Sequence, residues 1–196
     1  MCLDGGLRVF EVDPSKLGMR LKSFLTCAVT LYLLAASQVV VAAPPQDQCS
    51  FPPSLRDEIT QKYPGTRIVS LSDLSEDDRE LFQKEHADSC PGLVKVDFYG
   101  DGKPTLALAL TTKSEAGPKT KLVLAHQVGT NWKVAILDKA DGPVPVVWSD
   151  KPGEYKGVYQ HKIRATRPVI VFCGYSSWAV LYAWTNNRIA KLWLQD

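Results

Sequence analysis

The C-terminal half of the chain alternates between hydrophobic and polar residues. From Leu93 onward, large apolar side chains recur at every second position, in runs such as LVKVDF, LALAL, LVLAHQV and WKVAI. A period of two predicts β-strands with one buried face. Turn residues separate the runs, namely GDG, EAGPK, GTN, KADGP and TNNR. Because these links are short, we expect a mostly antiparallel meander sheet of six to eight strands.

Two amphipathic helices are predicted before these strands. Ser54 can act as the N-cap of the first helix, whose apolar face is formed by Leu55, Ile59 and Tyr63. A short strand, RIVSL (67–71), follows. The second helix begins after the cap residue Ser75 and runs to about residue 86, with acids in its first turn. The predicted fold class is therefore α+β, with two N-terminal helices packed on the sheet.

Residues 1–42 contain the layout of an export signal. A segment with Arg20 and Lys22 precedes the mainly apolar LYLLAASQVVVAA (31–43), and small residues place a cleavage point after Ala42. Residues 1–18 carry acids and a proline where a signal has basic residues, so we take Met19 as the true start and the first segment as an upstream extension. An uncleaved anchor is the alternative, but the apolar core is shorter than the ~20 residues that span a bilayer.

Residues 43–196 are therefore expected to form a single periplasmic or secreted domain of about 150 residues, with no stable membrane span after cleavage. The chain has 23 Lys and Arg against 21 Asp and Glu. This balance gives no reason to expect nucleic acid or a membrane surface as a partner.

Three of the five cysteines follow the expected cleavage point. Cys49 and Cys90 lie in polar, proline-flanked loops on either side of the helical region, and we favour a disulfide between them over the other two pairings. Cys173 ends the apolar run PVIVFC, so we expect it to be buried as a small hydrophobe. Closing a loop of roughly 40 residues would stabilise the fold by about 4 kcal/mol.

The stretch DFYGDGKP (97–104) has two interpretations. As a hairpin with a three-residue loop, it pairs Val96 with Leu106 and puts the large apolar side chains on one face, with Gly102 in the left-handed conformation. The stretch also resembles the D-x-D-G-D-G calcium loops of FG-GAP/VCBS-type repeats. In that resemblance Asp97 and Asp101 match ligand positions, whereas Tyr99 replaces one ligand. Two carboxylates fall short of the six to eight oxygens that calcium takes, so we expect a turn and no cofactor.

The last hairpin carries the candidate binding residues. A two-residue turn at Asn186-Asn187 pairs Trp184 with Ile189, Tyr182 with Lys191 and Val180 with Trp193. One face is then aliphatic and belongs to the core. The other face is aromatic with one cation, and if exposed it would be a binding surface formed by Tyr182, Trp184, Lys191 and Trp193. The alternative is that the rest of the fold covers it.

No catalytic residues are predicted. The stretch CGYSSW (173–178) resembles the papain-type cysteine signature, but all three histidines precede it in the chain. His126 shares a strand face with Leu124 and Val128, which favours a hydrogen-bonded core histidine. We therefore do not expect an enzyme.

The chain resembles small exported bacterial proteins of uncharacterised activity. The resemblance is carried by four segments in this order: PPSLRDEITQKYPG, LSDLSEDDR, CPGLVKVDFYGDGKP and VIVFCGYSSWAVLYAW. The resemblance implies a single-domain secreted protein. Our first hypothesis is a non-enzymatic protein that binds an unknown protein or glycan. A second is a hydrolase with a site not recognisable from sequence, which requires a cleft where His126 or His161 meets a carboxylate or hydroxyl. A third is a calcium-stabilised structural domain.

Overall fold

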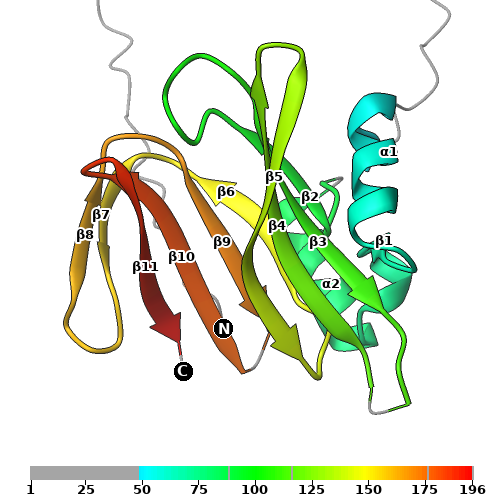
Figure 1. Cartoon of the computed structure of the whole chain (residues 1–196). Coiled ribbons are helices and arrows are strands. Elements are labelled where there is room, and N and C mark those ends of the chain that lie inside the picture. Colours follow the sequence, from blue (N-terminus) through cyan, green and yellow to red (C-terminus); the bar gives the residue numbers. More distant parts are fainter. Residues whose placement is uncertain (1–48, 88, 116, 176, 196) are drawn as a thin grey trace, which may run out of the picture. The chain divides into compact units, whose positions relative to one another are not determined.

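The computed structural model describes residues 49–87, 89–115, 117–175 and 177–195. The expected extension, signal segment and cleavage point therefore lie outside the described residues. Two helices, α1 (Pro53–Lys62) and α2 (Glu76–His86), lie near the start of the described chain, and between them come the short strand β1 (Arg67–Ile68) and a 3-10 turn at Leu71–Asp73 (Figure 1). The strands are β1 (Arg67–Ile68), β2 (Leu93–Val96), β3 (Thr105–Thr112), β4 (Lys119–Val128), β5 (Asn131–Asp141), β6 (Val146–Asp150), β7 (Gly153–Lys156), β8 (Lys162–Ala165), β9 (Val169–Gly174), β10 (Trp178–Thr185) and β11 (Arg188–Gln195).

The strands form three antiparallel sheets and not the single meander predicted from the sequence. In the first sheet, of five strands, the order is β1-β3-β4-β5, and β2 also pairs with β3. Among the described residues, the second sheet has four strands in the order β11-β10-β9-β6, and β7 pairs with β8 in a separate two-stranded sheet. The strands β9 and β10 are buried on both faces over most of their length. One sheet with a solvated face cannot bury such strands, whereas two stacked sheets can.

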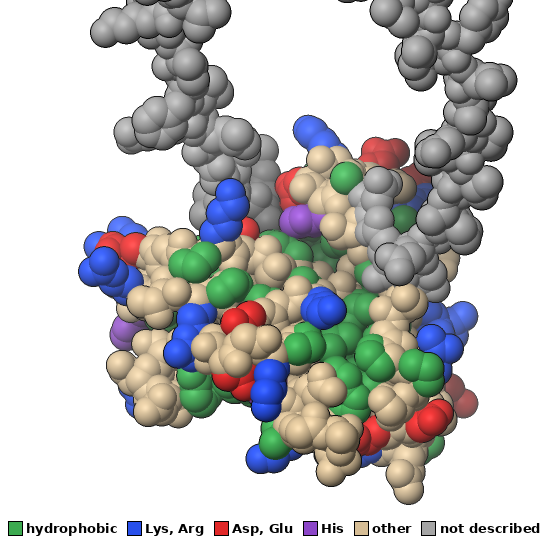
Figure 2. Space-filling model, turned by 90° about the horizontal axis from the view of Figure 1, so that it is seen from above, with side chains coloured by type: hydrophobic (Ala, Val, Ile, Leu, Met, Phe, Trp, Pro, Cys, Tyr) green, Lys and Arg blue, Asp and Glu red, His purple; other side chains and the backbone are tan. Residues whose placement is uncertain are grey.

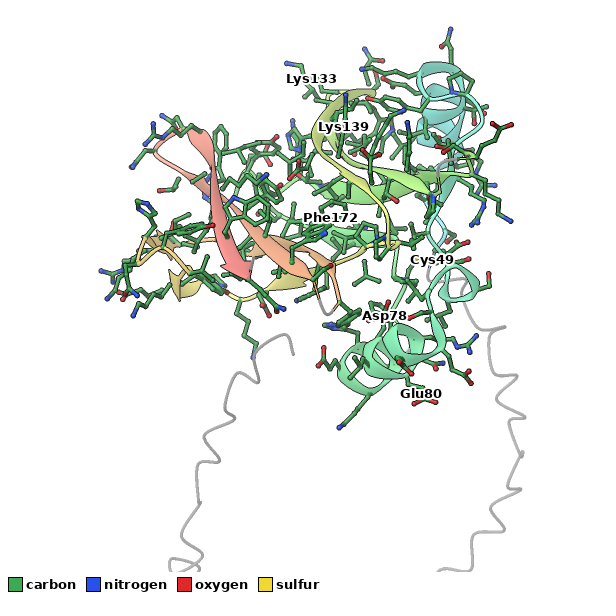
Figure 3. The ribbon with its side chains drawn as sticks, turned by 90° about the horizontal axis from the view of Figure 1, so that it is seen from below. Cys49, Asp78, Glu80, Lys133, Lys139 and Phe172 are labelled. Carbon is green, nitrogen blue, oxygen red and sulfur yellow. A yellow bond between two sulfur atoms is a disulfide. The ribbon has the colours of Figure 1, made fainter. Side chains whose placement is uncertain are left out.

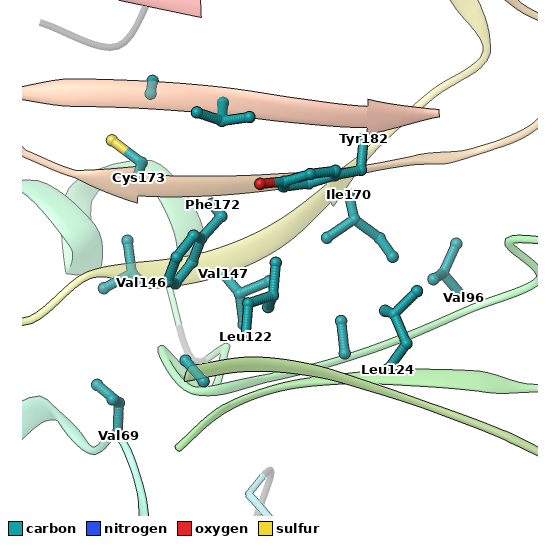
Figure 4. Close-up of a cluster of buried hydrophobic side chains, with 14 of the residues drawn as sticks. Val69, Val96, Leu122, Leu124, Val146, Val147, Ile170, Phe172, Cys173 and Tyr182 are labelled. Atoms are coloured by element: carbon teal, nitrogen blue, oxygen red, sulfur yellow. The ribbon is translucent and has the colours of Figure 1, made fainter. Parts of the chain in front are cut away.

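The first and second sheets pack face to face around one hydrophobic cluster. In Figure 4, Leu122 of the first sheet points toward Val147 of the second, Leu124 points toward Ile170, and the ring of Tyr182 lies in the same layer. Outside this layer, α1 covers the first sheet, and the β7–β8 pair covers the second. The α+β assignment is thus compatible with the structure, in which antiparallel sheets dominate.

The ends of the predicted helices show how local signals compare with the observed structure. Ser75 caps α2 as predicted, because its hydroxyl accepts a hydrogen bond from the backbone of Asp78. The prediction for Ser54 is wrong, since α1 begins at Pro53 and has no side-chain cap. Proline suits the first helical position because its missing N–H would have no partner there. The Ser54 hydroxyl instead accepts a hydrogen bond from Trp132 at 3.3 Å.

The predicted register of β2 and β3 is wrong by one residue. Val96 lies opposite Thr105 and not opposite Leu106. A shift of one residue exchanges the two faces of a strand. The prediction assumed one buried face, but β3 directs leucines toward α1 and the smaller Ala107 and Ala109 toward the second sheet. The connection therefore spans residues 97–104, with Gly102 in the left-handed region at φ +76°, as predicted.

The predicted disulfide and the last hairpin are confirmed. Cys49 is bonded to Cys90, 41 residues apart, which ties the segment before α1 to the segment before β2. All three residue pairs predicted for β10 and β11 occur in the structure. Asn186 and Asn187 both have positive φ, as a two-residue turn of this type requires. No helix within the described ranges is long and apolar enough to cross a bilayer.

Candidate functional site

A cleft of about 480 Å³ lies between the two large sheets, at the end of the sandwich where the β2–β3, β4–β5 and β10–β11 connections are found. Its size is within the range typical of small-ligand sites, ~300–1,000 Å³. The lining residues are Tyr99, Asp101, Leu124, His126, Val128, Lys133, Ala135, Ile136, Leu137 and Ile189. The face seen in Figure 2 carries groups of exposed hydrophobic side chains between separate basic and acidic ones.

Most of the cleft wall is aliphatic. The strands β4 and β5 supply most of this wall, and Ile189 of β11 contributes from the second sheet. Val128 and Ile136 are each 40% exposed, which is high for large apolar side chains. Exposed apolar side chains that line one cleft are a marker of binding surfaces, because water contact with them is unfavourable.

Tyr99 is held in place by the β2–β3 connection. The Asp97 carboxylate accepts a hydrogen bond from the backbone of Gly102 at 3.2 Å, and Arg167 donates to the carbonyl oxygen of Tyr99. Gly100 has φ +66°, which favours glycine, and a Cβ atom there would lie 2.3 Å from Nε of Arg167, so a larger residue would have to displace this arginine. The loop is therefore anchored to the chain segment before β9, and its aromatic side chain is fixed at the cleft.

The ring of Tyr99 bridges the two sheets. Its centroid is 4.6 Å from the His126 ring on β4 and 4.8 Å from the Trp184 ring on β10, both in edge-to-face geometry. Burial raises the pKa of Tyr99, so its phenol remains protonated near neutral pH. The hydroxyl makes no hydrogen bond to another residue in the described ranges, and it is therefore available as a donor to a ligand.

His126 is hydrogen-bonded at both ring nitrogens. Nδ1 lies 3.0 Å from the hydroxyl of Thr105, and Nε2 lies 3.2 Å from a carboxylate oxygen of Asp101. The sequence predicted a hydrogen-bonded core histidine here, and these two contacts agree with it. They also match the hydrolase hypothesis, in which His126 meets a carboxylate or hydroxyl in a cleft.

The exposure of these partners does not suit nucleophilic catalysis. In a serine-type triad the hydroxyl faces the substrate, while the acid is buried behind the histidine. Here Thr105 is 0% exposed, whereas the Asp101 side chain is 42% exposed. The order of burial is reversed, so the hydroxyl that contacts His126 is closed to a substrate. His161, the other histidine considered, is exposed and does not line the cleft.

The aromatic face of the last hairpin points at the first sheet. Tyr182 is 1% exposed and donates a hydrogen bond to Asp138 of β5, so it cannot contact a ligand in this conformation. Trp184 is half-buried behind Tyr99, and Trp193 is half-buried beneath Lys191, whose Nζ lies 4.8 Å from its ring centroid. The four residues therefore do not form one open patch. For Tyr182 the alternative interpretation holds, in which the rest of the fold covers the aromatic face.

Sequence reasoning missed Asp138, which joins the two sheets. Its carboxylate accepts hydrogen bonds from Tyr182 and, at 2.8 Å, from Nζ of Lys191. Desolvation acts to raise the pKa of Asp138, but the bonds from Lys191 and Tyr182 hold it below its ordinary value. The local signal is a β-bulge that interrupts the alternation in β5. Leu122 of β4 pairs with Asp138, and the next residue, Val123, pairs with Ile136, so Leu137 is the extra residue.

The two candidate calcium ligands are used within the loop. Asp97 accepts from the backbone of Gly102, and Asp101 accepts from the backbone of Lys103 at 3.1 Å as well as contacting His126. Within the described ranges, no group of three or more His, Cys, Asp or Glu side chains is placed to hold a metal ion.

Comparisons with known protein families, with curated proteins and with solved structures found no match for this chain.

Proposed function

We propose that this chain is an exported, non-enzymatic binding protein whose ligand occupies the cleft between the two sheets. The observation that carries the proposal is an apolar cleft with two large exposed side chains, Val128 and Ile136, at its wall. Each Å² of apolar surface that a ligand covers there contributes roughly 25 cal/mol. The site is next to the aromatic hairpin face expected from the sequence, with Tyr99 and Ile189 in place of the buried Tyr182.

Export is supported by two observations. The layout of residues 19–43 is that of a signal segment. The Cys49–Cys90 disulfide is typical of periplasmic or secreted proteins, where thiols are not kept reduced.

The cleft favours a small ligand over a protein or glycan docked on the hairpin. Carbohydrate sites and protein interfaces present open aromatic rings, and here the rings of Trp184 and Tyr99 pack edge-to-face on each other. The ligand-accessible surface is mainly aliphatic and concave, which suits a compact apolar group.

Binding of the neutral fluorescent probe N-phenyl-1-naphthylamine tests the proposal. We expect the protein to increase the probe's fluorescence, and Val128→Asp combined with Ile136→Asp to weaken binding by about tenfold or more, because two charges replace apolar contacts. Leu81→Asp is the matched control, since Leu81 is 36% exposed on α2 and does not line the cleft. Equal loss in the control, or no loss in the double variant, would contradict the proposal.

The two other hypotheses give different results in simple assays. A hydrolase acting through His126 predicts turnover of a p-nitrophenyl ester that His126→Gln abolishes, whereas we expect none above background. A calcium-stabilised domain predicts a Tm that rises with calcium and no longer rises in Asp101→Ala. Because both loop carboxylates already accept backbone hydrogen bonds, we expect calcium to leave the Tm unchanged.

A further inference from the structure

The charged side chains that line the cleft differ in whether they have protein partners. Three titratable side chains face it besides Tyr99, namely Asp101, His126 and Lys133. Asp101 and His126 are partners of each other at 3.2 Å, and Asp101 also accepts from the backbone of Lys103. Lys133 forms no ion pair or hydrogen bond with any residue in the described ranges, so its ammonium group has no protein partner there.

Lys133 and His126 lie side by side on neighbouring strands of the first sheet. They are directly paired across β4 and β5, a relation that brings Cβ atoms to about 4.5–5.5 Å. The next inward pair on the same face is Leu124 with Ala135, both aliphatic and both lining the cleft. The polar His126–Lys133 pair thus lies between Val128, next to the β4–β5 turn, and the aliphatic Leu124–Ala135 pair farther along the strands.

Two residues that line this space carry hydrogen-bond donors with no protein partner in the described ranges. These donors are the ammonium group of Lys133 and the hydroxyl of Tyr99, which the Arg167-anchored loop fixes at the cleft. The acceptor that lines the cleft, the Asp101 carboxylate, is already engaged. A ligand that supplies acceptor oxygens with negative charge would satisfy both donors, and charge-assisted bonds of this kind are the stronger ones.

We propose that the cleft binds a single-chain amphiphile, with its aliphatic chain along Leu124, Leu137 and Ile189 and its anionic head group at Lys133 and the Tyr99 hydroxyl. This inference deepens the proposed function and depends on it. The same head-group chemistry exists in an unbound alkyl acid and in an anionic lipid within a membrane, so the experiment includes both sources.

The test compares four probes of the same chain length by NMR, below their micelle concentrations. These probes are decanoate, decyl phosphate, decanol and decyltrimethylammonium. We expect amide shifts in β4, β5 and the β2–β3 loop, with both anions bound at least about tenfold more tightly than decanol and the cation weakest. Because the mouth is open to solvent, this preference should shrink at high salt.

Lys133→Met is the decisive variant, because it keeps the aliphatic stem and removes the charge. We expect the preference of decanoate over decanol to fall to within about twofold in this variant. Lys139→Met is the matched control, since Lys139 projects from the same strand and does not line the cleft (Figure 3). The control should keep the wild-type preference.

The outcomes separate the two proposals. If all four probes bind in the cleft with equal affinity, the cleft is a binding site but the inference about the head group is wrong. If none of them shifts cleft amides, both proposals fail. Binding of phosphatidylglycerol vesicles that depends on Lys133, with weak binding of decanoate, would support the anionic head group and identify the membrane as its source.

Discussion

At the scale of single residues, the polar side chains inside this domain are placed by strands distant in sequence. Thr105 bonds to His126 on the neighbouring strand, and Tyr182 bonds to Asp138 on the opposite sheet. Buried polar groups need such partners, because an unmet donor or acceptor costs about 1–3 kcal/mol. His86 departs from this rule, since its buried Nε2 makes no hydrogen bond within the described part of the chain.

His86, whose buried Nε2 has no hydrogen bond but lies 3.8 Å from a carboxylate oxygen of Glu85, predicts a loss of stability in mild acid. Burial against Phe82 and Trp148 lowers the pKa of His86, although nearby Glu85 and Asp150 act to raise it. Because the folded-state pKa is below the unfolded value of 6.5, the unfolded chain binds the proton more readily. Stability therefore falls as the pH drops below about 6.5, by at most about 1.4 kcal/mol per pH unit for one proton.

Urea unfolding at pH 5 to 7.5 measures this effect. His86→Phe should flatten the dependence between pH 5 and 6.5, because the replacement ring packs in the same place and does not titrate. His161→Gln, at an exposed position, is the control and should keep the wild-type slope. An unchanged slope in His86→Phe would show that other groups cause the dependence.

At the scale of elements, hairpins with a tight turn were predictable, and the hairpin with a longer connection was not. The turn at Asn186-Asn187 fixes the pairing of β10 with β11, since a two-residue turn leaves one register. The β2–β3 connection has no such constraint. Its register follows from the packing of α1 on one face of β3 and the second sheet on the other, which alternation alone cannot indicate.

The Asn turn makes a prediction about backbone conformation. Asn187 has φ +57°, a region that β-branched residues tolerate poorly. We expect Asn187→Val to destabilise the protein by roughly 1–2 kcal/mol, measured by urea unfolding. Asn187→Gly is the matched control and should be tolerated, since Asn-Gly is a favoured pair in this turn. Equal destabilisation by both variants would mean that the Asn side chain, and not its backbone, matters.

At the scale of the whole domain, contacts between the sheets define the cleft. Asp138 links β5 to β10 and β11, while Tyr99 contacts both sheets at the β2–β3 loop. On the other side, the backbone N–H of Val147 in β6 donates to the carbonyl oxygen of Pro91 at 2.8 Å, which joins the sheet edges. The cleft is thus the part of the inter-sheet space that core side chains leave unfilled.

Removal of Asp138 should loosen this junction. Asp138→Ala leaves the buried hydroxyl of Tyr182 without its acceptor, so we expect a loss of about 1–3 kcal/mol in the free energy of unfolding. Tyr182→Phe removes the same hydroxyl, so the double variant should lose less than the sum of the two. Lys191→Met is the comparison for the exposed ion pair and should cost less than about 1 kcal/mol. Strict additivity in the double variant would contradict the proposed coupling.

The sequence by itself determined the local features of this protein. Alternation specified strands, Ser75 and its acids specified the start of α2, and paired asparagines specified the last hairpin. Loop context favoured the Cys49–Cys90 pairing over the two others, and the structure contains it. Each of these depends on a few residues close in the chain or on one covalent pairing. Only the tertiary structure decided that the strands divide into stacked sheets, that Tyr182 is covered, and that Tyr99, His126 and Lys133 meet at one cleft. Those outcomes depend on which face of each sheet packs against the other sheet. Such packing joins residues distant in the chain, so the hydrophobic periodicity of the sequence does not indicate it.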